Sequence, residues 1–216
     1  MTPSTEGGPG RFIVFEGGEA CGKTTQASAL AARIGAVLTR EPGGTSVGRA
    51  IRSVVLDPAA HAVDERTEAL LMAADRAQHV AELIRPTLHE GRHVVSDRYI
   101  GSSLAYQGHG RGLPLADIER LSSWATGGLQ PDLVVLLDLP VEVARERRRD
   151  ATDRMEAEDA VFHRRVRDGF LTLAEANDEV WIVLDASRSV EEVMAAVSAV
   201  VVERLGLDGP DGAGTT

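Results

Sequence analysis

The sequence predicts a mostly parallel α/β fold, and three observations support that prediction. Five short apolar runs recur along the 216 residues, and the segments between them are long enough to form crossover helices. Each run is nearly continuous rather than alternating, as is typical of strands buried on both faces of a sheet. The first run leads into a glycine-rich loop and then a good helix-forming stretch. Strands that alternate with helices in this way indicate a parallel sheet covered by helices.

The individual elements follow from the same pattern. We expect strands at residues 12–15, 36–38, 94–95, 133–137 and 180–184. We expect helices at residues 24–33, 46–56, 65–89, 115–125, 141–149, 156–176 and 189–204. Pro140 stands where the first turn of a helix accepts proline. Ser189 and Glu192 form a capping-box pattern at the start of the last helix.

Length, composition and charge limit the class of protein. We expect one domain, residues 11–205, between two polar tails at residues 1–10 and 206–216. The net charge of -10 argues against a general nucleic-acid or membrane-surface binder, so a bound anion would need locally clustered arginines. The single cysteine excludes an internal disulfide, no apolar run is long enough to span a bilayer, and the N-terminus lacks a secretory pattern. We therefore expect a soluble, cytoplasmic protein.

The stretch GGEACGKT fits the phosphate-binding pattern G-x-x-x-x-G-K-[ST], between a predicted strand and a predicted helix. Glycines allow such a loop backbone angles closed to other residues, so its N–H groups can surround a polyphosphate. The helix that begins near Lys23 adds the positive end of its dipole. Lys23 is expected to reach the β- and γ-phosphates, and the Thr24 hydroxyl to hold Mg²⁺. The predicted nucleotide-binding residues here are Gly17, Gly18, Glu19, Ala20, Cys21, Gly22, Lys23 and Thr24.

Charged residues also stand where other predicted strands end, and ligands of parallel sheets bind beyond those carboxyl ends. Arg40-Glu41 follows the second strand, Asp97-Arg98 the third, and Asp185-Ala186-Ser187 the fifth. Each alone could be ordinary surface charge, but together they surround one crevice. Asp97 is placed to hold Mg²⁺ or its waters, with an ion pair to Arg98 as the alternative. Arg98 suits a bidentate grip on a phosphate.

Two further segments offer contacts to a substrate. Met72 and Arg76 are four residues apart and share a helix face, which suits a base and its phosphate. The alternative is a core methionine and a surface arginine. Residues 101–112, GSSLAYQGHGRG, lie outside the predicted helices and are rich in glycine and polar residues. They offer side chains close to Asp97-Arg98, including a glutamine that could read a base edge: Ser102, Ser103, Tyr106, Gln107 and Arg111.

Residues 145–156, RERRRDATDRME, contain five arginines. Because acidic residues alternate with them, a solvated helix is the alternative to an anion-binding segment. On a helix, Arg145, Arg148 and Arg149 share one face and Arg147 points elsewhere. The six histidines show no metal-ligand spacing.

Taken together, these motifs resemble the bacterial thymidylate kinases. The matching pieces are FIVFEGGEACGKTTQ, LTREPGGTSVGRAIR, ALLMAADRAQH, VVSDRYIGSSLAYQGHGRG, PDLVVLLDLP, ATDRME and LDASRSVEEV. They run in the family's order from about residue 11 to 205. The combination of REPGGT with DRY and S-x-A-Y-Q-G is specific, whereas other nucleoside monophosphate kinases share the phosphate loop but not this set.

The resemblance implies a P-loop NTPase-type fold of three layers, with a five-stranded parallel sheet and an arginine-rich lid at about residues 145–156. It implies a homodimer that uses ATP and Mg²⁺ to phosphorylate dTMP, giving ADP and dTDP. By matching position, Arg149 would be the catalytic lid arginine and Arg154 would support ATP, while Asp185, Ala186 and Ser187 would lie along the adenine. Lys23, Asp97 and Arg98 complete the expected catalytic set.

The same resemblance assigns the substrate pocket. Arg76 and Arg98 would grip the dTMP phosphate, Gln107 would hydrogen-bond the thymine, and Glu19 would approach the 3′-hydroxyl. Family members usually carry an aromatic ring where this chain has Met72, and eukaryotic members carry an arginine where it has Ala20. The expected substrate-binding residues are Glu19, Glu41, Met72, Arg76, Arg98, Ser102, Ser103, Tyr106 and Gln107, and the expected metal ligands are Thr24 and Asp97.

Two alternatives remain at this point. One is another phosphoryl-transfer kinase, for dUMP or for a deoxynucleoside. The other is a nucleotide-dependent switch that binds partners rather than making a product. Guanine-reading switches carry an N-K-x-D segment after a late strand, and this sequence has none.

Overall fold

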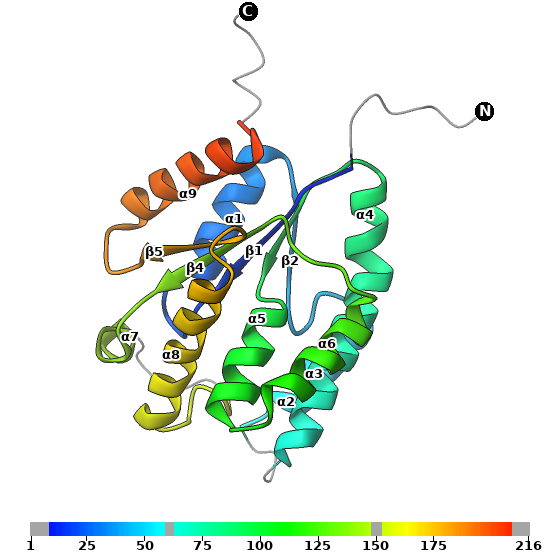
Figure 1. The fold of residues 1–216 in the computed structure, drawn as a ribbon, viewed down its shortest axis with the longest axis vertical. Helices are drawn as coiled ribbons and strands as arrows, with labels where there is room; N and C mark the ends of the chain where they lie inside the picture. The colour runs from blue at the N-terminus through cyan, green and yellow to red at the C-terminus, as the bar shows by residue number, and fades with distance from the viewer. Residues whose placement is uncertain (1–8, 59–62, 148–152, 209–216) are drawn as a thin grey trace, which may run out of the picture.

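The computed structural model describes residues 9–58, 63–147 and 153–208. Its centre is a five-stranded sheet in the order β2-β3-β1-β4-β5 (Figure 1). The strands are β1 (Phe12–Glu16), β2 (Val37–Arg40), β3 (Val94–Asp97), β4 (Leu133–Asp138) and β5 (Trp181–Asp185), and every neighbouring pair is parallel. This confirms the predicted fold class and the positions of all five strands.

Alternate side chains of β1 face two different apolar layers. Ile13 and Phe15 pack in a core with α1 (Lys23–Ile34) and α9 (Val190–Leu205) on one face of the sheet. Phe12 and Val14 pack on the other face against the helical segment that ends at His89. Figure 1 shows the sheet between these two helical layers. Because β1 is central and wholly buried, the loop that follows it is held on a rigid strand.

The two edge strands, β2 and β5, are not buried on both faces as the apolar runs predicted. Their side chains are partly exposed, and only the central strands β1, β3 and β4 are almost entirely buried. An edge strand has a sheet neighbour on one side only, and here its outer residues are covered incompletely by helices. The apolar composition of a strand therefore did not reveal its place in the sheet.

Most predicted helices are confirmed to within a few residues. They are α1, α2 (Ser46–Val55), α3 (Glu65–His79), α4 (Arg85–His89), α6 (Leu115–Thr126), α7 (Val141–Arg147), α8 (Ala160–Ala176) and α9. The capping box at Ser189 and Glu192 is present. The predicted helix 65–89 contains a π-helical segment, η1 (Val80–Ile84), that separates α3 from α4. It lies just before Pro86, which has no N–H to donate to a regular helical ladder.

One helical region was missed. Residues 100–110 form α5 (Ile100–Ser103) and the π-helical η2 (Leu104–Gly110), where the glycine-rich composition predicted no helix. Two glycines of this region do not form a turn; they allow other elements to pack closely against the helix. A Cβ on Gly101 would come within 2.7 Å of Trp181, and one on Gly110 within 2.7 Å of Phe162. The tertiary contacts override the low helix propensity of glycine.

None of the helices in the described ranges is long and apolar enough to cross a membrane. The arginine-rich segment begins within α7, which contains Arg145 and Arg147, and Arg148 and Arg149 lie outside the described residues.

Candidate active site

The phosphate loop joins the buried end of β1 to α1. Gly17 has a φ of 141° and Gly22 a φ of 88°, both in the region that favours glycine. A Cβ on Gly17 would come within 2.5 Å of the carbonyl oxygen of Leu137 on β4, so the loop approaches the neighbouring strand closely. The Lys23 ammonium is buried and donates to the carbonyl oxygen of Gly18, inside the loop. Strand, loop, lysine and helix are therefore arranged as the motif predicts.

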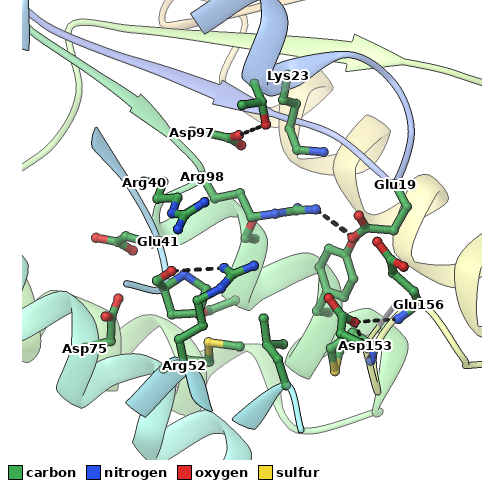
Figure 2. A pocket seen from close by; sticks show the side chains of 18 of the residues that line it. Glu19, Lys23, Arg40, Glu41, Arg52, Asp75, Asp97, Arg98, Asp153 and Glu156 are labelled. Atoms are coloured by element: carbon green, nitrogen blue, oxygen red, sulfur yellow. Dashed lines mark hydrogen bonds and ion pairs between the residues drawn. The ribbon is translucent and has the colours of Figure 1, made fainter. Parts of the chain in front are cut away.

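Thr24 and Asp97, the two predicted metal ligands, are neighbours. The Thr24 hydroxyl donates to Oδ2 of Asp97 at 2.6 Å, because β1 and β3 pair in parallel and their carboxyl ends meet (Figure 2). Two protein oxygens fit Mg²⁺, which usually keeps several waters and binds through one or two protein ligands plus phosphates. Among the described residues, no group of three or more histidine, cysteine, aspartate or glutamate side chains could hold a metal.

Arg98 is locked beside the phosphate loop. Its guanidinium donates to the Gly17 carbonyl at 3.0 Å and to Oε1 of Glu19 at 2.7 Å, and it lies over the ring of Tyr106. The residue has a φ of 76°, an uncommon backbone state for a non-glycine residue that costs about 1–3 kcal/mol. A strained arginine held against a phosphate loop indicates a functional position.

Glu19 is ionised in this arrangement. Burial alone would raise its pKa, but the charges of Arg98 and Lys23 outweigh burial and lower the pKa to about 2. The Tyr106 hydroxyl donates to the same carboxylate at 2.6 Å. The carboxylate therefore remains a hydrogen-bond acceptor at the mouth of the loop at any ordinary pH.

A cavity of about 550 Å³ extends from the phosphate loop to α3 and η2. Its volume is typical of sites for small molecules. Figure 2 shows the guanidinium groups of Arg40, Arg52 and Arg98 near its centre, with carboxylates on both sides. Glu19, Asp153 and Glu156 lie on one side, and Glu41 and Asp75 on the other. The cavity also brings together the predicted substrate-binding residues Glu41, Met72, Arg76, Ser102, Ser103, Tyr106 and Gln107.

Arg40, which the sequence analysis placed at the crevice, lines the cavity, whereas Arg52 lines it and was missed. Arg52 lies on α2, and its guanidinium donates to the Pro42 carbonyl at 3.0 Å. Burial lowers the pKa of Arg52, and repulsion by the nearby charge of Arg40 lowers it further. The clue to Arg52 in the sequence was its position within the REPGGT-containing piece LTREPGGTSVGRAIR.

Arg76 makes more hydrogen bonds within the protein than the sequence suggested. It is buried, and its Nε donates to Oε2 of Glu41 at 2.8 Å. Its Nη2 donates to the Tyr99 carbonyl and to the Ser103 hydroxyl, each at 3.0 Å. His79 holds the other oxygen of Glu41 at 2.9 Å. With most of its N–H groups used in this way, Arg76 has little capacity for a bidentate grip, and its phosphate contact stays a prediction.

Gln107 lies on η2 and lines the cavity. Its side chain is buried, and Nε2 donates to Oε1 of Glu68 at 2.9 Å. Glu68 was not singled out from the sequence. It lies one helical turn before Met72 on α3, so the two side chains share a face of the helix. Met72 lines the cavity, and Glu68 is joined to the cavity through Gln107.

The described parts of the arginine-rich segment make two unexpected contacts. Arg147 donates to the carbonyl oxygens of Ala186 and Ser187 at 2.9 and 3.2 Å, so it contacts the turn predicted to lie along the adenine. Arg154 bonds to Oε2 of Glu68 and donates to the Val55 carbonyl at 3.1 Å. In this structure Arg154 therefore contacts Glu68, the hydrogen-bond partner of Gln107, while its predicted contact with ATP remains untested. Arg149 is outside the described residues.

A phosphate loop at the end of a central parallel strand, facing an arginine-rich cavity, defines a P-loop nucleotide kinase. Residues 15–197 match the profile of the family described as Thymidylate kinase. The thymidylate kinase of Deinococcus radiodurans is 50% identical over 202 residues, which cover 90% of this chain and 98% of that protein. The thymidylate kinase of Geotalea uraniireducens is 46% identical over 209 residues, covering 91% and 98%.

A solved structure agrees with these sequence matches. The crystal structure of thymidylate kinase from Ehrlichia chaffeensis aligns with a TM-score of 0.72 at 32% sequence identity, covering 88% of this chain and 99% of that one. The chain belongs to the thymidylate kinase family.

Proposed function

We propose that this protein transfers the γ-phosphate of ATP to dTMP, giving ADP and dTDP. The observation that carries the proposal is a cavity whose lining includes Lys23 of the phosphate loop, Gln107 on η2 and several arginines. A nucleoside monophosphate placed in it would have its phosphate near the phosphate loop and its base near Met72 and Gln107. The dTMP phosphate oxygen would then attack the γ-phosphorus in line.

The chain's own residues would align and neutralise two anions, with no covalent intermediate on the protein. Lys23 and the loop N–H groups would hold the β- and γ-phosphates. Thr24 and Asp97 would hold Mg²⁺, which supplies positive charge to the same phosphates. Arg98 and Arg52 would face the dTMP phosphate, and Arg149 is proposed as the lid arginine that contacts the transferring group.

We further propose a cytoplasmic homodimer with one kinase domain at residues 11–205 and a lid at about residues 145–156. The family resemblance supports the homodimer and the lid, and the single cysteine and net charge of the sequence support a cytoplasmic location. Asp185, Ala186 and Ser187 are proposed to lie along the adenine, since they follow β5 at the carboxyl end of the sheet.

The test is ADP release from ATP, measured with dTMP, dUMP, dCMP, dGMP and AMP in turn. We expect dTMP to give the highest kcat/KM, and Lys23→Ala to abolish turnover while dTMP binding by calorimetry is largely retained. ADP release that does not depend on the added monophosphate would indicate a switch or a simple ATPase. Preference for a different monophosphate would indicate another kinase of the same fold.

A further inference from the structure

Glu68 is a fully buried carboxylate that contacts Gln107, one of the residues lining the cavity. Its side chain has no exposed surface, and it lies on the same face of α3 as Met72 and Arg76, four and eight residues on. Burial of a carboxylate is costly unless it is paired. The partners of Glu68 must therefore compensate the cost of burying its charge.

Both oxygens of Glu68 accept hydrogen bonds from charged or amide donors. Oε1 accepts from Gln107 Nε2 at 2.9 Å and from Arg111 Nε at 3.3 Å. Oε2 accepts from Arg111 Nη2 at 3.2 Å and from Arg154 Nη2. Burial would raise the pKa of Glu68, but these donors outweigh it and lower the pKa below its ordinary value. The carboxylate is therefore ionised and can only accept hydrogen bonds.

An acceptor-only partner fixes the orientation of the Gln107 amide. The nitrogen of the amide must face Glu68, because its oxygen there would meet a carboxylate oxygen. Gln107 lines the cavity, and no donor among residues 9–58, 63–147 and 153–208 hydrogen-bonds its Oε1. The amide oxygen is thus the atom left to face a bound base.

We propose that Glu68 is a positioning residue for base selection, which holds the acceptor oxygen of Gln107 toward the N3–H of a pyrimidine. The inference rests on the proposed function and deepens it. Thymine and uracil carry a donor at N3, whereas cytosine carries a lone pair there. A fixed acceptor accepts the first two bases and repels the third, and it does not read the 5-methyl group. Rejection by an unpaired buried polar group is stronger than rejection by shape alone.

The decisive variant is Glu68→Gln. A glutamine at 68 can accept from or donate to Gln107, so both orientations of the Gln107 amide become possible. We expect the ratio of kcat/KM for dTMP over dCMP to fall about 10-fold or more. The ratio for dTMP over dUMP should stay unchanged, because both bases have N3–H. An equal loss on all three substrates would mark Glu68 as merely structural and overturn the proposal.

Glu158→Gln is the matched control. Glu158 is the other acidic partner of Arg111, at 2.6 Å, and its contact is to the arginine and not to Gln107. The control removes one negative charge from the same cluster, so both substrate ratios should remain at the wild-type values. A fall of the dTMP to dCMP ratio as large as that of Glu68→Gln would show that charge balance, and not amide orientation, sets selectivity.

A double variant keeps the proposal testable if Glu68→Gln folds poorly. In Glu68→Gln with Gln107→Glu, position 107 is again restricted to accepting, so the preference for dTMP over dCMP should return. A preference that stays low in this folded variant overturns the proposal. Calorimetry on the wild-type protein adds a separate check, since N3-methyl-dTMP, which lacks the donor, should bind at least about 10-fold more weakly than dTMP. Equal binding would overturn the acceptor role. Failure of the wild-type protein to phosphorylate dTMP would instead refute the proposed function.

Discussion

Individual arginines in the cavity are held in different ways, and the differences predict their roles. Arg98 has a carboxylate partner in Glu19. Arg52 donates to a neutral carbonyl, and its charge is repelled by Arg40. A bound phosphate would relieve that repulsion, so Arg52 should gain more from an anion than an arginine already paired with a carboxylate.

We therefore predict that Arg52→Met raises the KM for dTMP about 10-fold or more, since a hydrogen bond to a charged group is worth about 1.5–3 kcal/mol. Arg49→Met is the control, because Arg49 is exposed on the same helix and should leave the KM within about 2-fold, as surface substitutions usually do. Binding of thymidine, which lacks the phosphate, should be the same in both variants. If Arg52→Met weakens thymidine and dTMP equally, Arg52 does not contact the phosphate.

At the scale of elements, Glu16 joins the end of β1 to the start of α5. One of its oxygens accepts from the backbone N–H groups of Tyr99 and Ser102, each at 3.0 Å, and the other accepts from the Ser102 hydroxyl at 2.6 Å. Burial raises the pKa of Glu16 from 4.5 to about 7 despite these bonds and the nearby Arg98. The folded protein therefore keeps a proton that the unfolded chain loses.

This shift predicts the pH dependence of stability. Below pH 4.5 both states are protonated and the ionisation of Glu16 costs the folded state nothing. Between pH 4.5 and about 7 the unfolded chain has lost the proton and the folded protein has not, so the free energy of unfolding falls as the pH rises, and the loss is complete above pH 7. Glu16→Gln cannot ionise and keeps the acceptor for the two N–H groups. Urea unfolding should show the variant gaining about 2 kcal/mol on the wild type between pH 5 and pH 8. Parallel stability curves for the two proteins over that range would contradict the assignment.

The segment between α7 and α8 gives a second prediction at this scale. Arg154 in this segment makes side-chain contacts, and its backbone N–H also donates to the Leu56 carbonyl at 3.3 Å. Arg154 is therefore attached to the end of α2. If Arg154 acts through Glu68, then Arg154→Gln should raise the KM for dTMP several-fold and change the KM for ATP little. The opposite pattern would instead support the ATP contact expected from the family resemblance. Initial rates at varied ATP and varied dTMP separate the two outcomes.

For the molecule as a whole, local sequence patterns predicted the sheet and the phosphate loop because both depend on short, contiguous stretches. Apolar runs located the strands, and the loop motif located Lys23 and Thr24. The rest depends on tertiary packing. Glycine-rich composition concealed α5 and η2, whose glycines pack against other elements. Arg52, which lines the cavity, and Glu68, which contacts Gln107, lie on helices α2 and α3, and the direction of their side chains is fixed only when these helices are docked.

The proposed homodimer gives the last prediction. The packed helices α3 and α6 each expose a large apolar side chain, with Leu70 at 58% and Trp124 at 83% exposure. Such residues are typical of protein interfaces, and a second copy of the chain is the occupant that the family resemblance indicates. In a two-fold interface each substitution occurs twice, so Leu70→Glu or Trp124→Glu would bury two charges and should shift the sedimenting mass from dimer to monomer. Val190→Glu on α9, at 54% exposure, is the control and should leave the mass unchanged. Retention of the dimer in both α3 and α6 variants would place the interface on another surface.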